Sequence, residues 1–136
     1  MIEESYVSLE TAKLLKEVGF REHSRCMYYE EKDGSYKLYK CLIGDYDVST
    51  DKSYEGDLYG ERYLAPTQAL AARWLREVYN VAIYSLYDDD MEQCFYVVDA
   101  FMKNPMINVF QSGSEYDDYE SAFEDGLREA IKLIKK

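Results

Sequence analysis

An amphipathic stripe near the end of the chain constrains the fold more than any other sequence feature. Apolar and small residues recur there at helical spacing, at Tyr119, Ala122, Phe123, Gly126, Leu127, Ala130, Ile131 and Ile134. The spacing predicts a helix whose large apolar side chains, if fully buried, contribute about 1.5–3 kcal/mol each. Asp117 and Glu120 resemble a capping box at its start. Because glycine costs about 1 kcal/mol relative to alanine inside a helix, Gly126 predicts a close approach of the helix backbone to a sheet.

Two further helices are predicted upstream. Ser8 is a favourable N-cap and Gly19 a left-handed end for a first helix, whose apolar positions are Leu9, Ala12, Leu15 and Val18. Pro66 is expected at the first position of a second helix, whose stripe comprises Leu70, Trp74 and Val78 with Ala71 and Leu75 beside it.

The strands are predicted as hairpins. Asp33-Gly34 lies between tyrosine-rich alternating runs and favours a two-residue turn, with Cys26 opposite Cys41 as a pair of buried free thiols. Residues 81–87 and 93–101 flank an aspartate-rich turn and predict a second hairpin, and residues 106–111 predict a third strand after the Asn104-Pro105 turn. Residues 44–64 fit no period and are expected to form a long irregular loop.

The predicted fold is therefore α+β, with three helices packed on antiparallel sheet built from hairpins, in the order α-β-β-(long loop)-α-β-β-β-α. A chain of 136 residues with 47% hydrophobic residues can bury about two-thirds of its unfolded surface, enough for a core. We expect a single α+β domain over residues 1–136, because the first unit of about 43 residues is too small to hold a core alone.

The charge balance excludes several partners. With 27 acidic and 16 basic side chains, the net charge is −11, which disfavours direct binding to nucleic acid or to an anionic membrane. The α-β-β-β-α order of residues 66–134 matches that of a double-stranded-RNA-binding domain, but the last helix begins with an acidic cluster, so RNA binding is rejected. The acidic N-terminus and the odd cysteine count favour a cytoplasmic, reduced location.

No catalytic, cofactor or metal site is predicted. Residues 45–51 begin like a calcium loop, but Thr50 and Gly56 stand where that loop needs glycine and glutamate. Asp88-Asp89-Asp90 is expected to be a solvated turn, and the acidic residues 115–125 are expected to be capping or solvated. His23 lies three residues from Cys26, an odd spacing on a strand that points the two side chains to opposite faces.

Tyrosine is the one compositional excess, with 15 residues. Within the predicted loop 44–64, tyrosines alternate with serine, glycine and aspartate, a composition typical of binding loops. The candidate partner surface comprises Tyr46, Tyr54, Tyr59 and Tyr63. The alternative interpretation is that these rings cover the core while their hydroxyls stay hydrated.

Residues 65–78 and 126–134, together with residues 9–17, are similar to a family of short hypothetical proteins of gut Bacteroides-type bacteria and their phages or mobile elements. The resemblance spans most of the chain except residues 44–64. It brings no assigned activity and no functional residue. It implies a mobile-element setting, where small acidic proteins often bind host or phage proteins.

These observations together favour a non-enzymatic protein-binding module that recognises an unidentified protein partner or a second copy of itself. One alternative is an acidic inhibitor that imitates the charge of nucleic acid and occupies a nuclease or polymerase groove. A more remote alternative is a Mg²⁺-dependent hydrolase that uses residues 88–90 or 117–118, which requires carboxylates from separate segments to converge around an ion.

Overall fold

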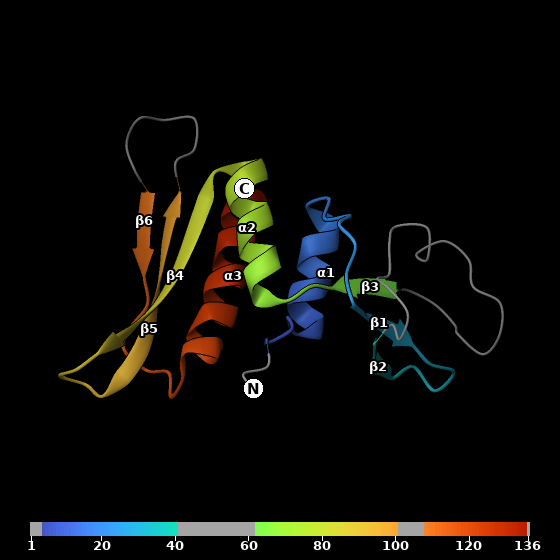
Figure 1. The fold of residues 1–136 in the computed structure, drawn as a ribbon, viewed down its shortest axis with the longest axis horizontal. Helices are drawn as coiled ribbons and strands as arrows, with labels where there is room; N and C mark the ends of the chain where they lie inside the picture. The colour runs from blue at the N-terminus through green and yellow to red at the C-terminus, as the bar shows by residue number, and fades with distance from the viewer. Residues whose placement is uncertain (1–3, 41–61, 101–107, 136) are drawn as a thin grey trace. The chain divides into compact units, whose positions relative to one another are not determined.

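The computed structural model of the chain describes residues 4–40, 62–100 and 108–135. Its elements follow the order α1 (Leu9–Glu17), β1 (Cys26–Glu30), β2 (Tyr36–Lys40), β3 (Arg62–Ala65), α2 (Gln68–Tyr79), β4 (Val81–Asp88), β5 (Gln93–Ala100), β6 (Asn108–Gln111) and α3 (Tyr119–Lys135), as labelled in Figure 1. Across the described residues these are three helices and two three-stranded antiparallel sheets, which confirms the α+β class. The chain divides into two compact units, Met1–Thr67 and Gln68–Lys136, each with its own core. The single domain expected over residues 1–136 stays a prediction.

In the first unit, α1 begins and ends where the sequence predicts. The side chain of Ser8 accepts a hydrogen bond from the N–H of Thr11, as an N-cap does. At the other end Gly19 has a φ of +97°, and the N–H of Phe20 donates to the carbonyl of Leu15. This is a Schellman end, in which glycine adopts the left-handed conformation at low cost.

The first sheet has the strand order β2-β1-β3, and the β1–β2 register differs from the prediction by one residue. Cys26 lies opposite Lys40, not Cys41, which lies outside the described residues. The reason is the turn: Glu31 and Ser35 pair, and Gly34 has a φ of +85°. A three-residue loop with a glycine bulge therefore replaces the predicted two-residue turn, and the expected pairing of two cysteines is wrong.

The predicted loop 44–64 ends earlier than expected, because residues 62–64 belong to β3, which pairs with β1. The remainder of that loop, residues 44–61, lies outside the described residues. β3 packs against α1, and the carbonyl of Arg62 accepts a hydrogen bond from Lys16 Nζ at 3.1 Å. The core of this unit comprises Val7, Ala12, Leu15, Phe20, Cys26, Met27, Tyr29, Leu64 and Ala65.

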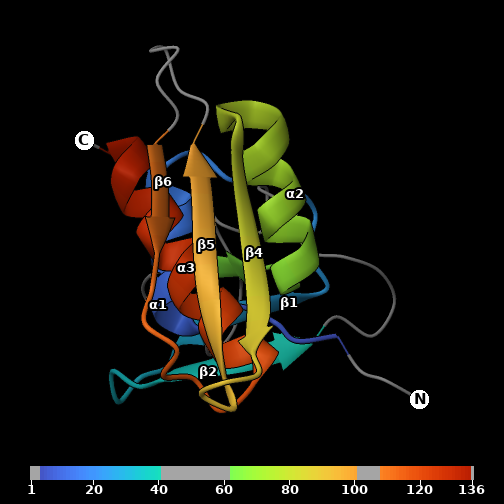
Figure 2. The same ribbon diagram turned by 90° about the vertical axis from the view of Figure 1, so that its left-hand side faces the viewer.

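The second unit is an antiparallel meander, β4-β5-β6, with both of its helices on the same face. Figure 2 shows this sheet in front, with α3 behind it and α2 beside β4. The predicted hairpin is confirmed, since Val81 pairs with Ala100 at one end and Asp88 with Gln93 at the other. The third strand is also present, although β6 begins at Asn108, and residues 106–107 lie outside the described residues.

Two details of α2 differ from the prediction. Pro66 does not open the helix, because its carbonyl accepts the N–H of Val7 and the helix begins at Gln68. Val78 was predicted on the apolar stripe but is 56% exposed, whereas Ala71, Trp74 and Leu75 are buried. The buried face of α2 is thus narrower than its sequence pattern indicates.

α3 packs against β4 and β5, and its backbone approaches the sheet closely at Gly126, as predicted. A Cβ atom added at Gly126 would lie 2.9 Å from Cγ2 of Ile83 and 3.2 Å from Cβ of Tyr96. The predicted capping residue is wrong by one position. The N-cap is Asp118, whose Oδ1 accepts the N–H of Ser121 at 2.7 Å, because the helix begins at Tyr119.

None of the helices within the described residues is long and apolar enough to cross a membrane.

Candidate functional site

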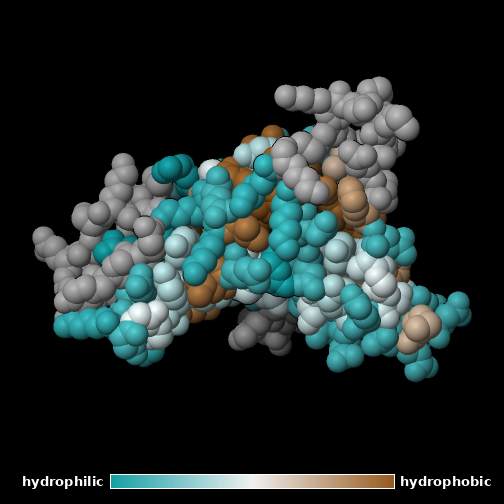
Figure 3. Space-filling view, turned by 180° about the vertical axis from the view of Figure 1, so that it is seen from behind, coloured by the Kyte–Doolittle hydropathy of each residue, from teal (hydrophilic) through white to brown (hydrophobic). Residues whose placement is uncertain are grey.

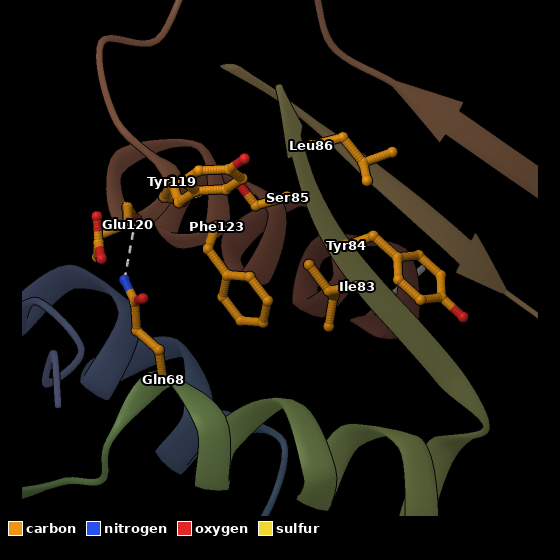
Figure 4. Close-up of a pocket in the computed structure, with 8 residues that line it drawn as sticks. All are labelled: Gln68, Ile83, Tyr84, Ser85, Leu86, Tyr119, Glu120 and Phe123. Atoms are coloured by element: carbon orange, nitrogen blue, oxygen red, sulfur yellow. Dashed lines mark hydrogen bonds between the residues drawn. The ribbon is translucent and has the colours of Figure 1, made fainter. Parts of the chain in front are cut away.

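The second unit contains an open groove of about 350 Å³ beside β4. Its lining comes from four consecutive residues of β4, the first residue of α2 and the first turns of α3: Ile83, Tyr84, Ser85, Leu86, Gln68, Tyr119, Glu120 and Phe123. We call this the edge groove (Figure 4). Because neighbouring strand residues point to opposite faces, a hollow lined by four in a row runs along the edge of the strand.

Three hydrogen bonds hold the rim of the edge groove. The side-chain amide of Gln68 donates to the carbonyl of Glu120 and to Oε1 of Glu124, both at 3.0 Å. The hydroxyl of Ser85 donates to the carbonyl of Tyr119 at 2.9 Å. The carbonyls of Tyr119 and Glu120 can accept an intrahelical hydrogen bond with one lone pair and a side-chain donor with the other. The bonds from Gln68 and Ser85 thus tie α2 and β4 to α3.

The apolar floor of the edge groove consists of Ile83 and Phe123, which point toward each other in Figure 4. Phe123 was predicted to be buried, but it is only half-buried, because one side of its ring faces the groove. The close packing at Gly126 brings α3 onto Ile83 and sets the depth of this floor.

No helix of the described residues packs on the opposite face of the sheet, which has its own apolar cluster. Tyr84 pairs with Val97, and Leu86 with Phe95, so these four side chains share one face. Tyr84 is 50% exposed and Leu86 45%, and Figure 4 shows both pointing away from the groove. We call these four residues the outer patch.

More exposed apolar side chains surround the hairpin that joins β4 to β5. Tyr87, Met91 and Tyr119 are each about half exposed or more. In Figure 3, white and tan atoms gather over this end of the second unit, among teal polar atoms. Exposed apolar residues are common on proteins, but neighbouring ones on one strand and its hairpin mark a surface suited to contact another molecule.

Asp99 lies beside the outer patch. It pairs with Ala82 and lies two residues after Val97, so its side chain is on the same sheet face. Its Oδ1 atom is buried and forms no hydrogen bond with any group of the described residues. A buried carboxylate oxygen without a hydrogen-bond partner is energetically unfavourable.

The tyrosines predicted as a partner surface are described only in part. Tyr46, Tyr54 and Tyr59 lie outside the described residues. Tyr63 is on β3, half-buried, with its ring 6.0 Å from that of Tyr36. Lys13 lies over both rings, and Lys16 lies 5.1 Å from the ring of Tyr63. Tyr63 thus packs within a tyrosine–lysine cluster of the first unit.

That cluster also affects Tyr36. Its hydroxyl donates to Oε2 of Glu30 at 3.2 Å. Loss of hydration raises the pKa of Tyr36 to about 12, and the neighbouring Tyr63 and Glu30 add to the rise. The ring is therefore neutral at physiological pH, as expected of a packing residue.

The acidic clusters that the structure describes do not converge into a metal site. Asp88 Oδ1 accepts the N–H groups of Asp90 and Met91, and its Oδ2 accepts the hydroxyl of Ser114 at 2.8 Å. The first two bonds close the hairpin turn, and the third ties it to the segment between β6 and α3. Within residues 4–40, 62–100 and 108–135, no three His, Cys, Asp or Glu side chains gather closely enough to hold an ion. The carboxylates required by the hydrolase alternative are thus not brought together there, and the calcium-like residues 45–51 lie outside the described residues.

Neither Cys26 nor Cys94 has the environment of a nucleophile. Cys26 and Cys94 are buried free thiols, and Cys41 lies outside the described residues. Burial raises the pKa of both thiols, whereas a catalytic cysteine needs a lowered pKa. His23 is exposed, in the segment before β1.

Sequence reasoning missed both the edge groove and the outer patch. The strand 81–87 was predicted, and its alternation places Ile83 on one face of the sheet and Tyr84 and Leu86 on the other. The strand is therefore apolar on both faces. That two-sided pattern is the signal that a partner was needed on the second face. Gln68 carries no recognisable signal, because its role depends on α3, more than fifty residues later.

No family model, no curated protein and no solved structure matches the chain.

Proposed function

We propose that this chain is a non-enzymatic protein-binding module that uses the second unit to bind another protein in the cytoplasm. The observation that carries the proposal is the outer patch. Four adjacent apolar side chains lie on a sheet face that none of the three described helices covers, in a chain with a net charge of −11. Clusters of this kind on an otherwise polar surface are typical of interaction sites. The phage or mobile-element setting rests on the family resemblance of the helices alone.

The partner is expected to be a different protein with a basic surface. Two copies of this chain would bring −11 against −11, which opposes self-association at low salt. Asp99 lies on the same sheet face as the outer patch and adds negative charge there, which a lysine or arginine of the partner would complement.

The test compares two leucines of equal exposure. Leu86 in the outer patch is 45% exposed, and Leu38 on β2 is 46% exposed. Each is changed to serine, and each variant captures partners from lysate of the native host for mass spectrometry, alongside the unchanged chain. We expect a protein that is retained by Leu38→Ser and lost by Leu86→Ser, since a central interface residue contributes about 2 kcal/mol or more.

Thermal melts accompany the capture, because exposed positions usually change stability by less than about 0.5 kcal/mol. Equal loss with both variants, or no reproducible partner, contradicts the proposal. A captured nuclease or polymerase that is indifferent to Leu86→Ser favours the acidic mimic instead. A dimer of the unchanged chain that Leu86→Ser dissociates shows that the partner is a second copy.

A further inference from the structure

β4 is the first strand of the sheet β4-β5-β6, and no other strand of residues 4–40, 62–100 and 108–135 pairs with the second side of its backbone. Which residues face that side follows from β5. The carbonyl of Tyr96 accepts the N–H of Ser112 on the β6 side, and the N–H of Tyr96 donates to the hydroxyl of Ser112. The backbone of Cys94 likewise pairs with Tyr116 on the β6 side.

Backbone groups of successive residues in an antiparallel strand point to alternate sides. If Cys94 and Tyr96 face β6, then Phe95 and Val97 face β4, where they pair with Leu86 and Tyr84. It follows that the N–H and C=O groups of Ile83, Ser85 and Tyr87 point away from the sheet. No backbone group among the described residues bonds to them.

Natural proteins usually protect such an edge with lysine, proline, a bulge or a short strand, or by covering it with a helix or loop. β4 is eight residues long, carries no lysine or proline, and only its last residue, Asp88, is charged. α2 lies beside it (Figure 2), but Ile83 and Ser85 line the edge groove and are accessible there. An accessible stretch of apolar edge is either an aggregation hazard or a place where another strand adds.

The edge groove supplies a second wall for an added strand. Ile83 and Ser85, whose backbone groups face outward, both line it, and Phe123 and Tyr119 of α3 face them across the hollow. The lined stretch of β4 spans about 10 Å, the length of three to four extended residues. Alternate side chains of an added strand would enter the groove, and the others would extend the outer patch beside Tyr84.

The negative charge of Glu120 at the groove favours an added strand that carries basic residues. Glu120 is exposed on the rim, and no described residue forms an ion pair with its carboxylate. A lysine or arginine next to the apolar residues of the added strand would lie near it, and charges of opposite sign steer and orient such a segment.

We propose that the partner binds through an extended segment with alternating apolar and basic residues, which adds as a fourth strand along the outer edge of β4. This inference rests on the proposed function and names the mode of binding at the same strand. Backbone hydrogen bonds to Ile83 and Ser85 would supply affinity, and the edge groove would supply specificity.

The probe is a random-peptide phage library selected on the full-length chain. Enriched peptides are synthesised with single N-methyl groups at each position in turn, which removes one backbone donor at a time. We expect methylation at alternate positions to weaken binding by about tenfold or more, and methylation at the intervening positions to change it little. Hydrogen exchange by NMR should show new protection at the amides of Ile83, Ser85 and Tyr87.

The outcomes separate this inference from the proposed function. Peptides that bind without alternation, protect no β4 amide and are lost with Leu86→Ser overturn strand addition and leave the outer patch as the binding surface. A library that yields no binder overturns strand addition as well, and the host-lysate comparison of Leu86→Ser with Leu38→Ser still decides the proposed function. Protection of these amides by a second copy of the chain also overturns the inference, because the added strand would then not come from a basic partner.

A charge test uses matched neutral variants. Glu120→Gln removes the rim carboxylate, and Asp89→Asn removes an exposed carboxylate at the hairpin turn that does not line the groove. We expect the first to weaken the selected peptides about threefold at low salt and the second to leave them unchanged. Equal effects of the two variants, or selected peptides without lysine or arginine, overturn the basic character of the segment.

Discussion

Gly126 and Asp118 determine how closely α3 approaches the sheet and where the helix begins. Gly126 allows the helix backbone to contact Ile83 and Tyr96 directly, and so brings Phe123 to the floor of the edge groove. Asp118 ends the preceding loop by accepting the N–H of Ser121. Gly126 acts through the absence of a Cβ atom, and Asp118 acts through its Oδ1 atom. Small substitutions at either position should therefore change the free energy of unfolding measurably.

Gly126→Ala should destabilise the second unit although alanine is the better helix former. The added methyl would lie 2.9 Å from Ile83 Cγ2 and 3.2 Å from Tyr96 Cβ, so it overpacks a site where neither neighbour can turn aside freely. Overpacking costs about 1–3 kcal/mol, against a gain of about 1 kcal/mol in helix propensity. Urea unfolding followed by circular dichroism measures the difference.

Gly113→Ala is its matched control, because an added Cβ there meets no atom within 4 Å. It should be neutral or slightly stabilising. If Gly126→Ala proves at least as stable as the unchanged chain, the helix and sheet are not in the contact described.

Asp118→Ala should lower the free energy of unfolding by about 1 kcal/mol at neutral pH, and Asp117→Ala should change it little, since only Asp118 caps α3. The backbone N–H of Ser121 lowers the pKa of the Asp118 carboxyl below its unfolded value of about 3.9. This contribution is therefore present above about pH 4 and is lost as the pH falls through the folded pKa.

Asp118→Asn should retain the cap without that pH dependence. Urea unfolding at neutral and acidic pH should show the unchanged chain losing more stability on acidification than Asp118→Asn does. Parallel losses in both proteins would show that Asp118 is not the titrating cap.

At the scale of elements, the first hairpin shows how one residue in a turn changes a whole ladder. Gly34 has a φ of +85°, and its N–H donates to the carbonyl of Glu31 while Asp33 Oδ1 accepts the N–H of Ser35. This loop is one residue longer than the turn that the Asp-Gly pair predicts. Every pair of the β1–β2 ladder is displaced by one residue as a result.

Gly34→Ala should destabilise the first unit by about 1–2 kcal/mol, because a side chain in the left-handed region crowds the following carbonyl. Gly34→Asn should recover part of the loss, since asparagine tolerates that region better than alanine. Thermal melts of the two variants check this order. An alanine variant as stable as the unchanged chain would indicate that the loop readily adopts another turn.

At the scale of the whole molecule, each unit buries its own core. The second unit closes around Leu75, Val98, Leu127 and Ile131, all provided by α2, β5 and α3. The first unit closes around Leu15 and Met27 with residues of β3. A core formed within one unit is expected to unfold as a unit.

Leu127→Ala should therefore lower hydrogen-exchange protection within residues 68–135 by about 2–5 kcal/mol, the range for a buried leucine, and leave protection in β1 and α1 almost unchanged. Leu15→Ala is the reciprocal variant and should act on the first unit alone. Amide exchange measured by NMR at native pH resolves the two sets. Equal losses in both units after either substitution would support the single cooperative domain predicted from the sequence.

Much of the fold could be predicted because its signals are local. The stripe of α3, the cap at Ser8, the left-handed end at Gly19 and the hairpin of β4 and β5 all follow from periodicity and turn chemistry. Two helix starts were nevertheless predicted at the wrong residue. Pro66 and Asp117 are each good helix starts by residue type, and the hydrogen bonds of Val7 and Ser121 decided against them.

The sequence by itself determined the number of helices, the α+β class, the hairpin of the second unit and the close approach at Gly126, because periodicity and glycine placement report which face of an element must be buried. The register of the first hairpin depended on its local turn, which the Asp-Gly pair did not specify fully. Only the tertiary structure decided the strand order, the exposure of Leu86 and the groove between β4 and α3. These depend on which distant segments meet, as Gln68 and Glu124 do. Contacts between residues far apart in the chain leave no periodic pattern, so the folded arrangement alone shows them.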